Sequence, residues 1–98
     1  MKMNKEKFLK TELGSSMIEC VKAWDHCLAE LKRYAYDVMT NCEYKTAKET
    51  ALWCQAQWEV YKMAVRQFYG IEYYFTWTDD YFGICTEDET DWLFKVEK

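Results

Sequence analysis

The sequence predicts an α+β domain with a short N-terminal helix, a long antiparallel helical hairpin and then a three-stranded antiparallel β-meander. Apolar residues first recur at alternating spacings of three and four in two successive segments, which is typical of amphipathic helices. After Gly70 they alternate with a period of two, which is typical of strands. We therefore expect one domain over residues 1–98, with a helical part at 1–70 and an acidic β-meander at 71–98.

The first helix is predicted from about Asn4 to Leu13. Phe8, Leu9 and Leu13 lie on one side of it. The Asn4 side chain can cap its start, and Gly14 can end it in a left-handed conformation.

The second helix is predicted to begin at Ser16, because Ser16 with Glu19 forms the capping-box pattern. Its apolar seam keeps the heptad-like spacing through Met17, Val21, Trp24, Leu28, Leu31, Ala35, Val38 and Cys42. Cys20, Cys27 and Tyr34 recur every seven residues beside this seam. We expect this second stripe to pack against the N-terminal helix or the sheet.

The third helix repeats the same design. Thr46 with Glu49 predicts its start, and Gly70 predicts its end. Its seam runs through Ala47, Ala51, Cys54, Trp58, Tyr61, Val65 and Phe68. Only about four residues around 43–45 would join the two long helices, so they must fold back into an antiparallel hairpin.

The meander is predicted from three alternating segments separated by polar turns at 78–80 and 87–91. The side chains expected to face the helices are Ile71, Tyr73, Phe75, Trp77, Trp92, Phe94 and Val96. Those expected to face outward are Tyr74, Leu93 and either Tyr81 or Phe82.

Composition indicates a reduced intracellular protein. Charged residues recur throughout, so we expect no membrane span, and residues 1–10 have no apolar segment behind their charges, so we expect no secretory signal. The five cysteines are an odd number without paired spacing, which favours buried thiols in the cytoplasm.

Charge is unevenly distributed along the chain. Residues 1–70 hold 11 Lys/Arg against 9 Asp/Glu, a net charge of +2, whereas residues 71–98 hold 2 against 8, a net charge of −6. The acidic turns either keep the protein soluble or dock a protein with a basic surface. The predicted partner-binding residues are Tyr74, Asp79, Asp80, Tyr81, Asp88, Glu89 and Asp91. The same charge disfavours direct binding of nucleic acid, although the aromatic sheet is similar to a base-stacking platform.

No residue pattern indicates an enzyme, a metal site or a cofactor. His26 is the only histidine, and adjacent Cys27 would project about 100° away from it on a helix. His26 with Glu30 supplies only two of the three or four ligands that zinc needs. We expect His26 on the helix surface or against a partner.

Two stretches, ALWCQAQWEVYKMAVRQFYG and YFGICTEDETDWLFKVEK, resemble small accessory proteins carried on bacterial phages and conjugative elements. This resemblance implies an intracellular bacterial protein that works by binding. Acidic inhibitors of host defence nucleases, anti-CRISPR proteins among them, belong to the same setting.

The sequence therefore favours a non-enzymatic intracellular protein-binding module. The alternative is a homodimer with a structural role, in which the heptad seams of two helical hairpins join into four helices.

Overall fold

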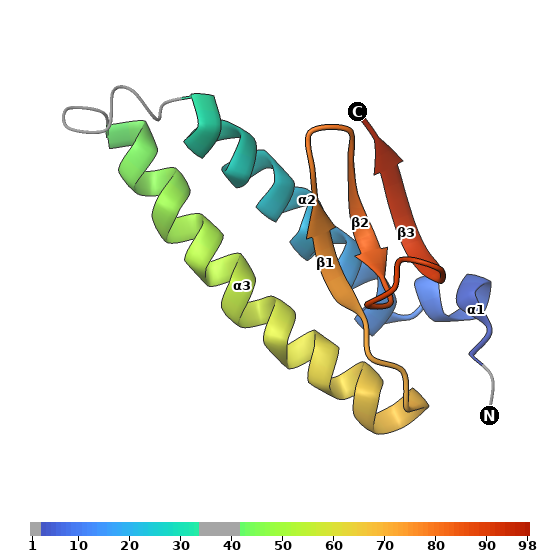
Figure 1. The fold of residues 1–98 in the computed structure, drawn as a ribbon. Helices are drawn as coiled ribbons and strands as arrows, with labels where there is room; N and C mark the ends of the chain where they lie inside the picture. Colours follow the sequence, from blue (N-terminus) through green and yellow to red (C-terminus); the bar gives the residue numbers. More distant parts are fainter. Residues whose placement is uncertain (1–2, 34–41) are drawn as a thin grey trace.

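The fold is seen in a computed structural model that describes residues 3–33 and 42–98 (Figure 1). Its elements, in chain order, are α1 (Lys5–Leu9), α2 (Glu12–Arg33), α3 (Cys42–Tyr69), β1 (Tyr74–Trp77), β2 (Tyr81–Cys85) and β3 (Trp92–Glu97). The long helices lie side by side, and the sheet lies across α2 (Figure 1). The predicted α+β class is confirmed, including the helix pair and the antiparallel order β1-β2-β3.

The boundary between the first two helices differs from the prediction. The Asn4 side chain caps α1 as expected, since its Oδ1 accepts from the Lys7 N–H at 3.1 Å. However, α1 ends at Leu9, and α2 already begins at Glu12. The Thr11 Oγ1 accepts from the Gly14 N–H at 3.1 Å, so Thr11 supplies the capping oxygen that was assigned to Ser16.

Gly14 is therefore an interior residue of α2 and not a helix stop. A Cβ at this position would collide with the Phe8 carbonyl oxygen of α1. The missing side chain lets α1 and α2 approach each other closely, which places Phe8 in the core at 2% exposure.

The predicted start of the third helix was also wrong. Helix α3 begins at Cys42, which was wrongly assigned to the seam of the second helix, so residues 43–45 are helical and Thr46 is not the cap. A Thr and a Glu three residues apart also fit inside a helix, where they are neighbours on its surface. Three residues predicted to pack in or beside the seam, Tyr34, Ala35 and Val38, lie outside the described residues.

The seam between α2 and α3 is confirmed over most of its length. Its most buried members are Met17, Val21, Cys54, Trp58 and Val65. Phe68 was wrongly assigned to it, because this side chain is 75% exposed. An α-helix drifts about 20° per heptad against a strict seven-residue repeat, so three heptads after Ala47 the pattern has turned Phe68 away from α2.

The second stripe of α2, which contains Cys20 and Cys27, faces α3. It was wrongly predicted to face α1 or the sheet. The Cys20 Sγ donates to the Cys54 carbonyl at 3.3 Å, and Cys27 also lies against the Cys54 thiol. The hairpin is therefore held by a wide interface that includes both stripes of α2.

The inner face of the sheet packs on α2 through aromatic side chains. Phe75 pairs with Ile84, which in turn pairs with Phe94. The Trp24 ring stacks on Phe75 with centroids 4.2 Å apart, and the Trp77 Nε1 donates to the Asp25 Oδ1 at 2.8 Å. The inward assignments of Phe75, Trp77, Phe94 and Val96 agree with their packing against the core.

A register shift in the meander reverses two predicted orientations. Ile84 pairs with Phe94 but Cys85 pairs with Trp92, so Leu93 is an extra residue in β3. This bulge buries Leu93 to 5% exposure, where it was expected to face outward. Trp92, expected inward, packs edge-on against Tyr81 with ring centroids 5.5 Å apart. Phe82 is buried, so Tyr81 is the outward residue of that pair.

The close crossing of α1 and α2 predicts that Gly14→Ala is destabilising. Overpacking of this kind costs about 1–3 kcal/mol, because backbone must move to admit the methyl group. Urea unfolding should show this loss, whereas the exposed neighbour Ser15→Ala should stay within about 0.5 kcal/mol of the parent protein. Equal stability of the Gly14→Ala variant would contradict the crossing.

Candidate functional site

The acids predicted to bind a partner lie in two different turns of the meander, and the predicted Tyr81 donates from its hydroxyl to the Glu89 carboxylate at 2.8 Å. Asp79 and Asp80 are in the turn between β1 and β2, whereas Asp88, Glu89 and Asp91 are in the segment between β2 and β3. The structure therefore brings together only part of the predicted set. Each turn has to be considered by itself.

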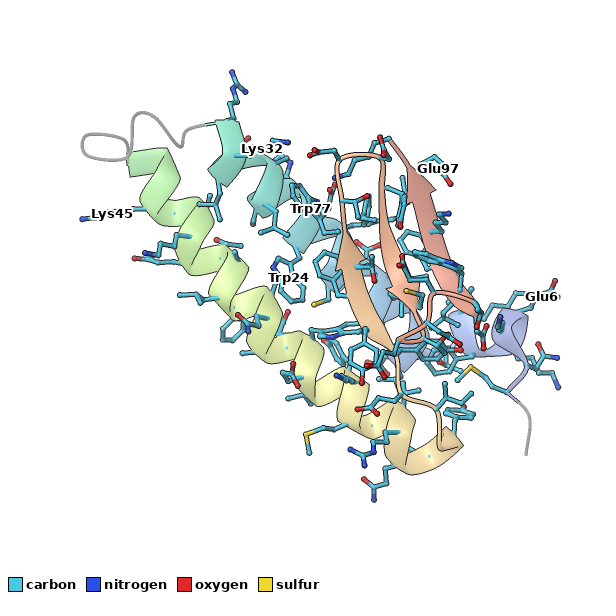
Figure 2. The ribbon with its side chains drawn as sticks, viewed as in Figure 1. Glu6, Trp24, Lys32, Lys45, Trp77 and Glu97 are labelled. Carbon is cyan, nitrogen blue, oxygen red and sulfur yellow. The ribbon has the colours of Figure 1, made fainter. Side chains whose placement is uncertain are left out.

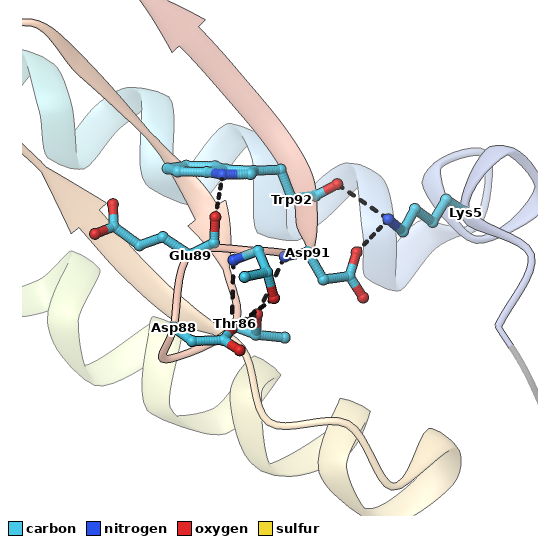
Figure 3. A network of polar contacts seen from close by, with 7 residues as sticks. Lys5, Thr86, Asp88, Glu89, Asp91 and Trp92 are labelled. Atoms are coloured by element: carbon cyan, nitrogen blue, oxygen red, sulfur yellow. Dashed lines mark hydrogen bonds and ion pairs between the residues drawn. The ribbon is translucent and has the colours of Figure 1, made fainter.

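Two of the predicted acids tie the sheet to the helices. The Asp79 carboxylate accepts from Lys32 of α2, and this hydrogen bond and the lysine charge lower the pKa of Asp79. The Asp91 carboxylate accepts from Lys5 of α1 (Figure 3). Both pairs are exposed, so each contributes little to stability, but each neutralises a charge that a partner would otherwise meet.

Asp88 organises the turn between β2 and β3 (Figure 3). Its Oδ1 accepts from the Thr86 and Thr90 hydroxyls at 2.8 Å each and from the Thr90 N–H at 3.3 Å. These hydrogen bonds to the ionised form lower the pKa of Asp88. Glu89 has a φ of 58°, and its carbonyl accepts from the Trp92 Nε1 at 2.9 Å. The turn is thus fixed by its own side chains.

A cleft of about 430 Å³ opens beside this turn. The residues that line it are Glu72, Tyr74, Thr86, Glu87 and Asp88, and we call them the acidic cleft. Only Tyr74 and Asp88 belong to the predicted set. Antiparallel pairing of Tyr74 with Cys85 carries Glu72 toward Glu87, so the missing members depended on a strand register that sequence does not specify.

The electrostatics of the acidic cleft favour a cation. Burial and then the charges of Glu72 and Glu87 raise the pKa of Tyr74. The Lys62 Nζ of α3 lies 3.9 Å from the Tyr74 ring centroid and 4.0 Å from a Glu72 carboxylate oxygen. One internal cation therefore already uses the combination of an aromatic face and a carboxylate.

Among residues 3–33 and 42–98, no cluster of three or more His, Cys, Asp or Glu side chains is arranged to hold a metal ion. The His26 side chain is 78% exposed on α2, with its Nε2 3.8 Å from Glu30. Its surface position agrees with the prediction.

The described thiols are free and buried. Burial, together with the nearby Cys54, raises the pKa of Cys20 to about 11, and burial also raises the pKa values of Cys27, Cys54 and Cys85. Thiols in this state are poor nucleophiles, because the thiolate is the reactive form.

Within the described residues, no helix has both the length and the apolar character needed to cross a membrane. No family model, curated protein or solved structure matches this chain. A functional proposal must therefore come from the chemistry of the surface.

We predict that Thr90→Val raises the pKa of Asp88 toward its ordinary value of 3.8. The folded pKa is depressed, so the contribution of Asp88 to stability is present above pH 3.8 and is lost as pH falls through the lower folded value. Carbon-13 NMR titration of the Asp88 carboxyl measures this pKa in the parent protein and in the Thr90→Val variant. Thr50→Val, on exposed α3 surface, should leave the Asp88 pKa unchanged. A wild-type value at or above 3.8 would contradict the hydrogen-bonded turn.

We also predict slow alkylation of the buried thiols. The shift of Cys20 from 9.0 to about 11 reduces its thiolate population about 100-fold at neutral pH. In a Cys42→Ser background, iodoacetamide should label the four described thiols far more slowly in buffer than in urea, as read by mass spectrometry. Rates within a few-fold of each other would show that the α2–α3 seam is open.

Proposed function

We propose that this protein is a non-enzymatic, cytoplasmic protein-binding module that docks a basic partner at the acidic cleft. The partner would insert an arginine or lysine side chain between the Tyr74 ring and the carboxylates of Glu72, Glu87 and Asp88. The proposal keeps the predicted basic partner but moves the centre of binding to one end of the meander.

The position of Lys62 carries this proposal. Its ammonium group lies over Tyr74 and beside Glu72, which is the pair of interactions that a partner's cation would make. Lys62, together with Arg66, whose charge also acts on Tyr74, does not neutralise all three carboxylates of the cleft. The Glu87 carboxylate has no hydrogen bond or ion pair with any residue that the structure describes, so it is available to a partner.

The chemistry of the acidic cleft favours protein over nucleic acid. Carboxylates repel the phosphate backbone, and residues 71–98 carry a net charge of −6. Cationic side chains have the opposite preference, and arginine also stacks on aromatic rings.

The exposed position of the cleft carboxylates determines how strongly they can bind a cation. Charges at an accessible rim raise the association rate and the specificity more than the affinity. We therefore expect a salt-sensitive interaction, in which the partner's remaining surface supplies most of the binding energy.

The resemblance to accessory proteins of phages and conjugative elements supports a bacterial setting for the proposal. A host nuclease has the basic surface that the acidic cleft would recognise. Inhibition of such a nuclease, as anti-CRISPR proteins do, is the specific form of the proposal that this setting favours.

An oligo-arginine peptide tests the cleft directly by fluorescence anisotropy. Glu72→Gln with Glu87→Gln should weaken binding about tenfold, because it removes two of the carboxylates that face the cation. The matched control, Asp80→Asn with Glu97→Gln, removes the same formal charge away from the cleft and should change Kd less than about twofold.

Equal weakening by both pairs would mean that only the net charge attracts the peptide. That outcome, or no measurable binding by the parent protein at low salt, would contradict a cation site at the acidic cleft.

A further inference from the structure

Helix α3 carries apolar side chains on a side that no described element covers. Leu52, Trp53, Val60 and Met63 are 59%, 65%, 65% and 67% exposed. Figure 1 shows α3 along one border of the molecule, with α2 and the sheet on one side of it only. Figure 2 shows side chains projecting from α3 away from both. Exposed apolar groups that gather on one face mark interaction surfaces more often than scattered ones do.

These residues form one continuous stripe. At 100° per residue, Leu52, Trp53, Ala56, Val60 and Met63 fall within a sector about 100° wide, on the opposite side of α3 from its buried seam. We call these five residues the outer stripe. The polar residues of the same sector lie at its two ends, with Lys45 and Glu49 before Leu52 and Gln67 after Met63. A helix with apolar stripes on two opposite sides has the pattern of one that packs between two neighbours.

We propose that the outer stripe is a self-association surface, on which α3 of a second copy packs antiparallel about a two-fold axis. The proposal is independent of the acidic cleft. It also differs from pairing through the seams, because the seam residues are buried between α2 and α3 of one chain.

Charges beside the outer stripe favour a second copy as the occupant. Lys48, Glu59 and Arg66 lie along one flank, whereas Thr50, Gln57 and Ala64 lie along the other, which is uncharged. In a two-fold antiparallel pair, each flank meets the same flank of the other copy. The flank with both signs of charge can therefore pair with itself.

The flank charges also select one register. When Lys48 of one copy lies opposite Glu59 of the other, two opposite-charge pairs form, and both copies of Trp53 lie near the axis. Sliding the helices by one heptad instead places Lys48 opposite Arg66, which is a like-charge pair. Neither Lys48 nor Glu59 has an ion pair with a residue that the structure describes, so both are available for this interface.

The area is sufficient for a modest dimer. The four large side chains of the outer stripe expose on the order of 500 Å² at their usual sizes, against about 800 Å² per partner in a standard interface. The aliphatic stems of Lys48 and Glu59 add to the covered surface. We therefore expect a weak dimer, whose population rises with protein concentration.

Sedimentation velocity on the full chain, over a wide range of concentration, should show a monomer–dimer equilibrium. Leu52→Ser with Trp53→Ser should raise the dimer Kd at least tenfold, and both positions are exposed, so the monomer should stay folded by circular dichroism. The control is Phe68→Ser, which is equally exposed but lies outside the outer stripe and should change Kd less than twofold.

Charge reversal tests the register. Lys48→Glu alone and Glu59→Lys alone should each weaken the dimer, and the two together should restore it. The two positions are 11 residues apart on one straight helix, so only contacts between copies can give this rescue.

A wild-type chain that stays monomeric near millimolar concentration would overturn the proposal and leave the outer stripe to a different protein. A dimer that persists after Leu52→Ser with Trp53→Ser, or one that the double charge reversal fails to restore, would overturn it as well.

Discussion

The contact between the sheet and α2 fixes where the sheet lies on the helical pair. The Trp24 ring lies nearly parallel to Phe75, at 19°, while the Trp77 indole N–H donates to Asp25 one residue further along α2. Lys98, at the end of the chain, adds an ion pair with Asp25 at 3.4 Å and lies 3.9 Å from the Trp77 ring centroid. The aromatic stack and the partly buried hydrogen bond together fix the distance and the orientation of the sheet relative to α2.

This placement divides α3 into a covered and an uncovered side. The three-stranded sheet lies over α2. The seam of α3 is covered by α2, but its opposite side has no neighbour within the described chain. The outer stripe is exposed because α2 covers only the seam of α3, while the sheet lies over α2 and not over the opposite side of α3.

The acidic cleft arises from the path of the chain after the C-terminal end of α3. Gly70, with a φ of +70°, ends the helix, and the chain then turns back toward the sheet. The return path carries Glu72 past Lys62 and brings it toward the turn that Asp88 holds in place. Acids that are distant in sequence thus meet because a helix stop and a self-supported turn lie side by side.

The sequence was sufficient for the periodic parts of the fold and insufficient for local exceptions to periodicity. Seam residues such as Met17 and Trp58 repeat over several turns, so their burial could be predicted. Capping patterns misled at Ser16 and Thr46, because a short polar motif fits a helix interior as well as its start. The bulge at Leu93 was invisible for a similar reason, since one inserted residue reverses an alternation without changing composition.

The candidate site was predictable only in its chemistry. An acidic, aromatic meander was evident from the charge of residues 71–98, but four of the five acids predicted to bind a partner proved to have internal roles. Those that tie or support the fold are Asp79, Asp88, Glu89 and Asp91. Which acids remain available depends on lysines at positions 5, 32 and 62, whose proximity arises only in the folded chain.

We infer that this one fold presents two separate surfaces, an acidic cleft for a cation and an outer stripe for a second copy. Nitrogen-15 NMR spectra would distinguish the two surfaces, if the concentrations of oligo-arginine peptide and of the protein are varied independently. We expect the peptide to shift amide signals around residues 72–74 and 86–88, and a rise in protein concentration to shift those of residues 48–63. Peptide-induced shifts centred on α3, or concentration-dependent shifts centred on the cleft, would contradict this inference.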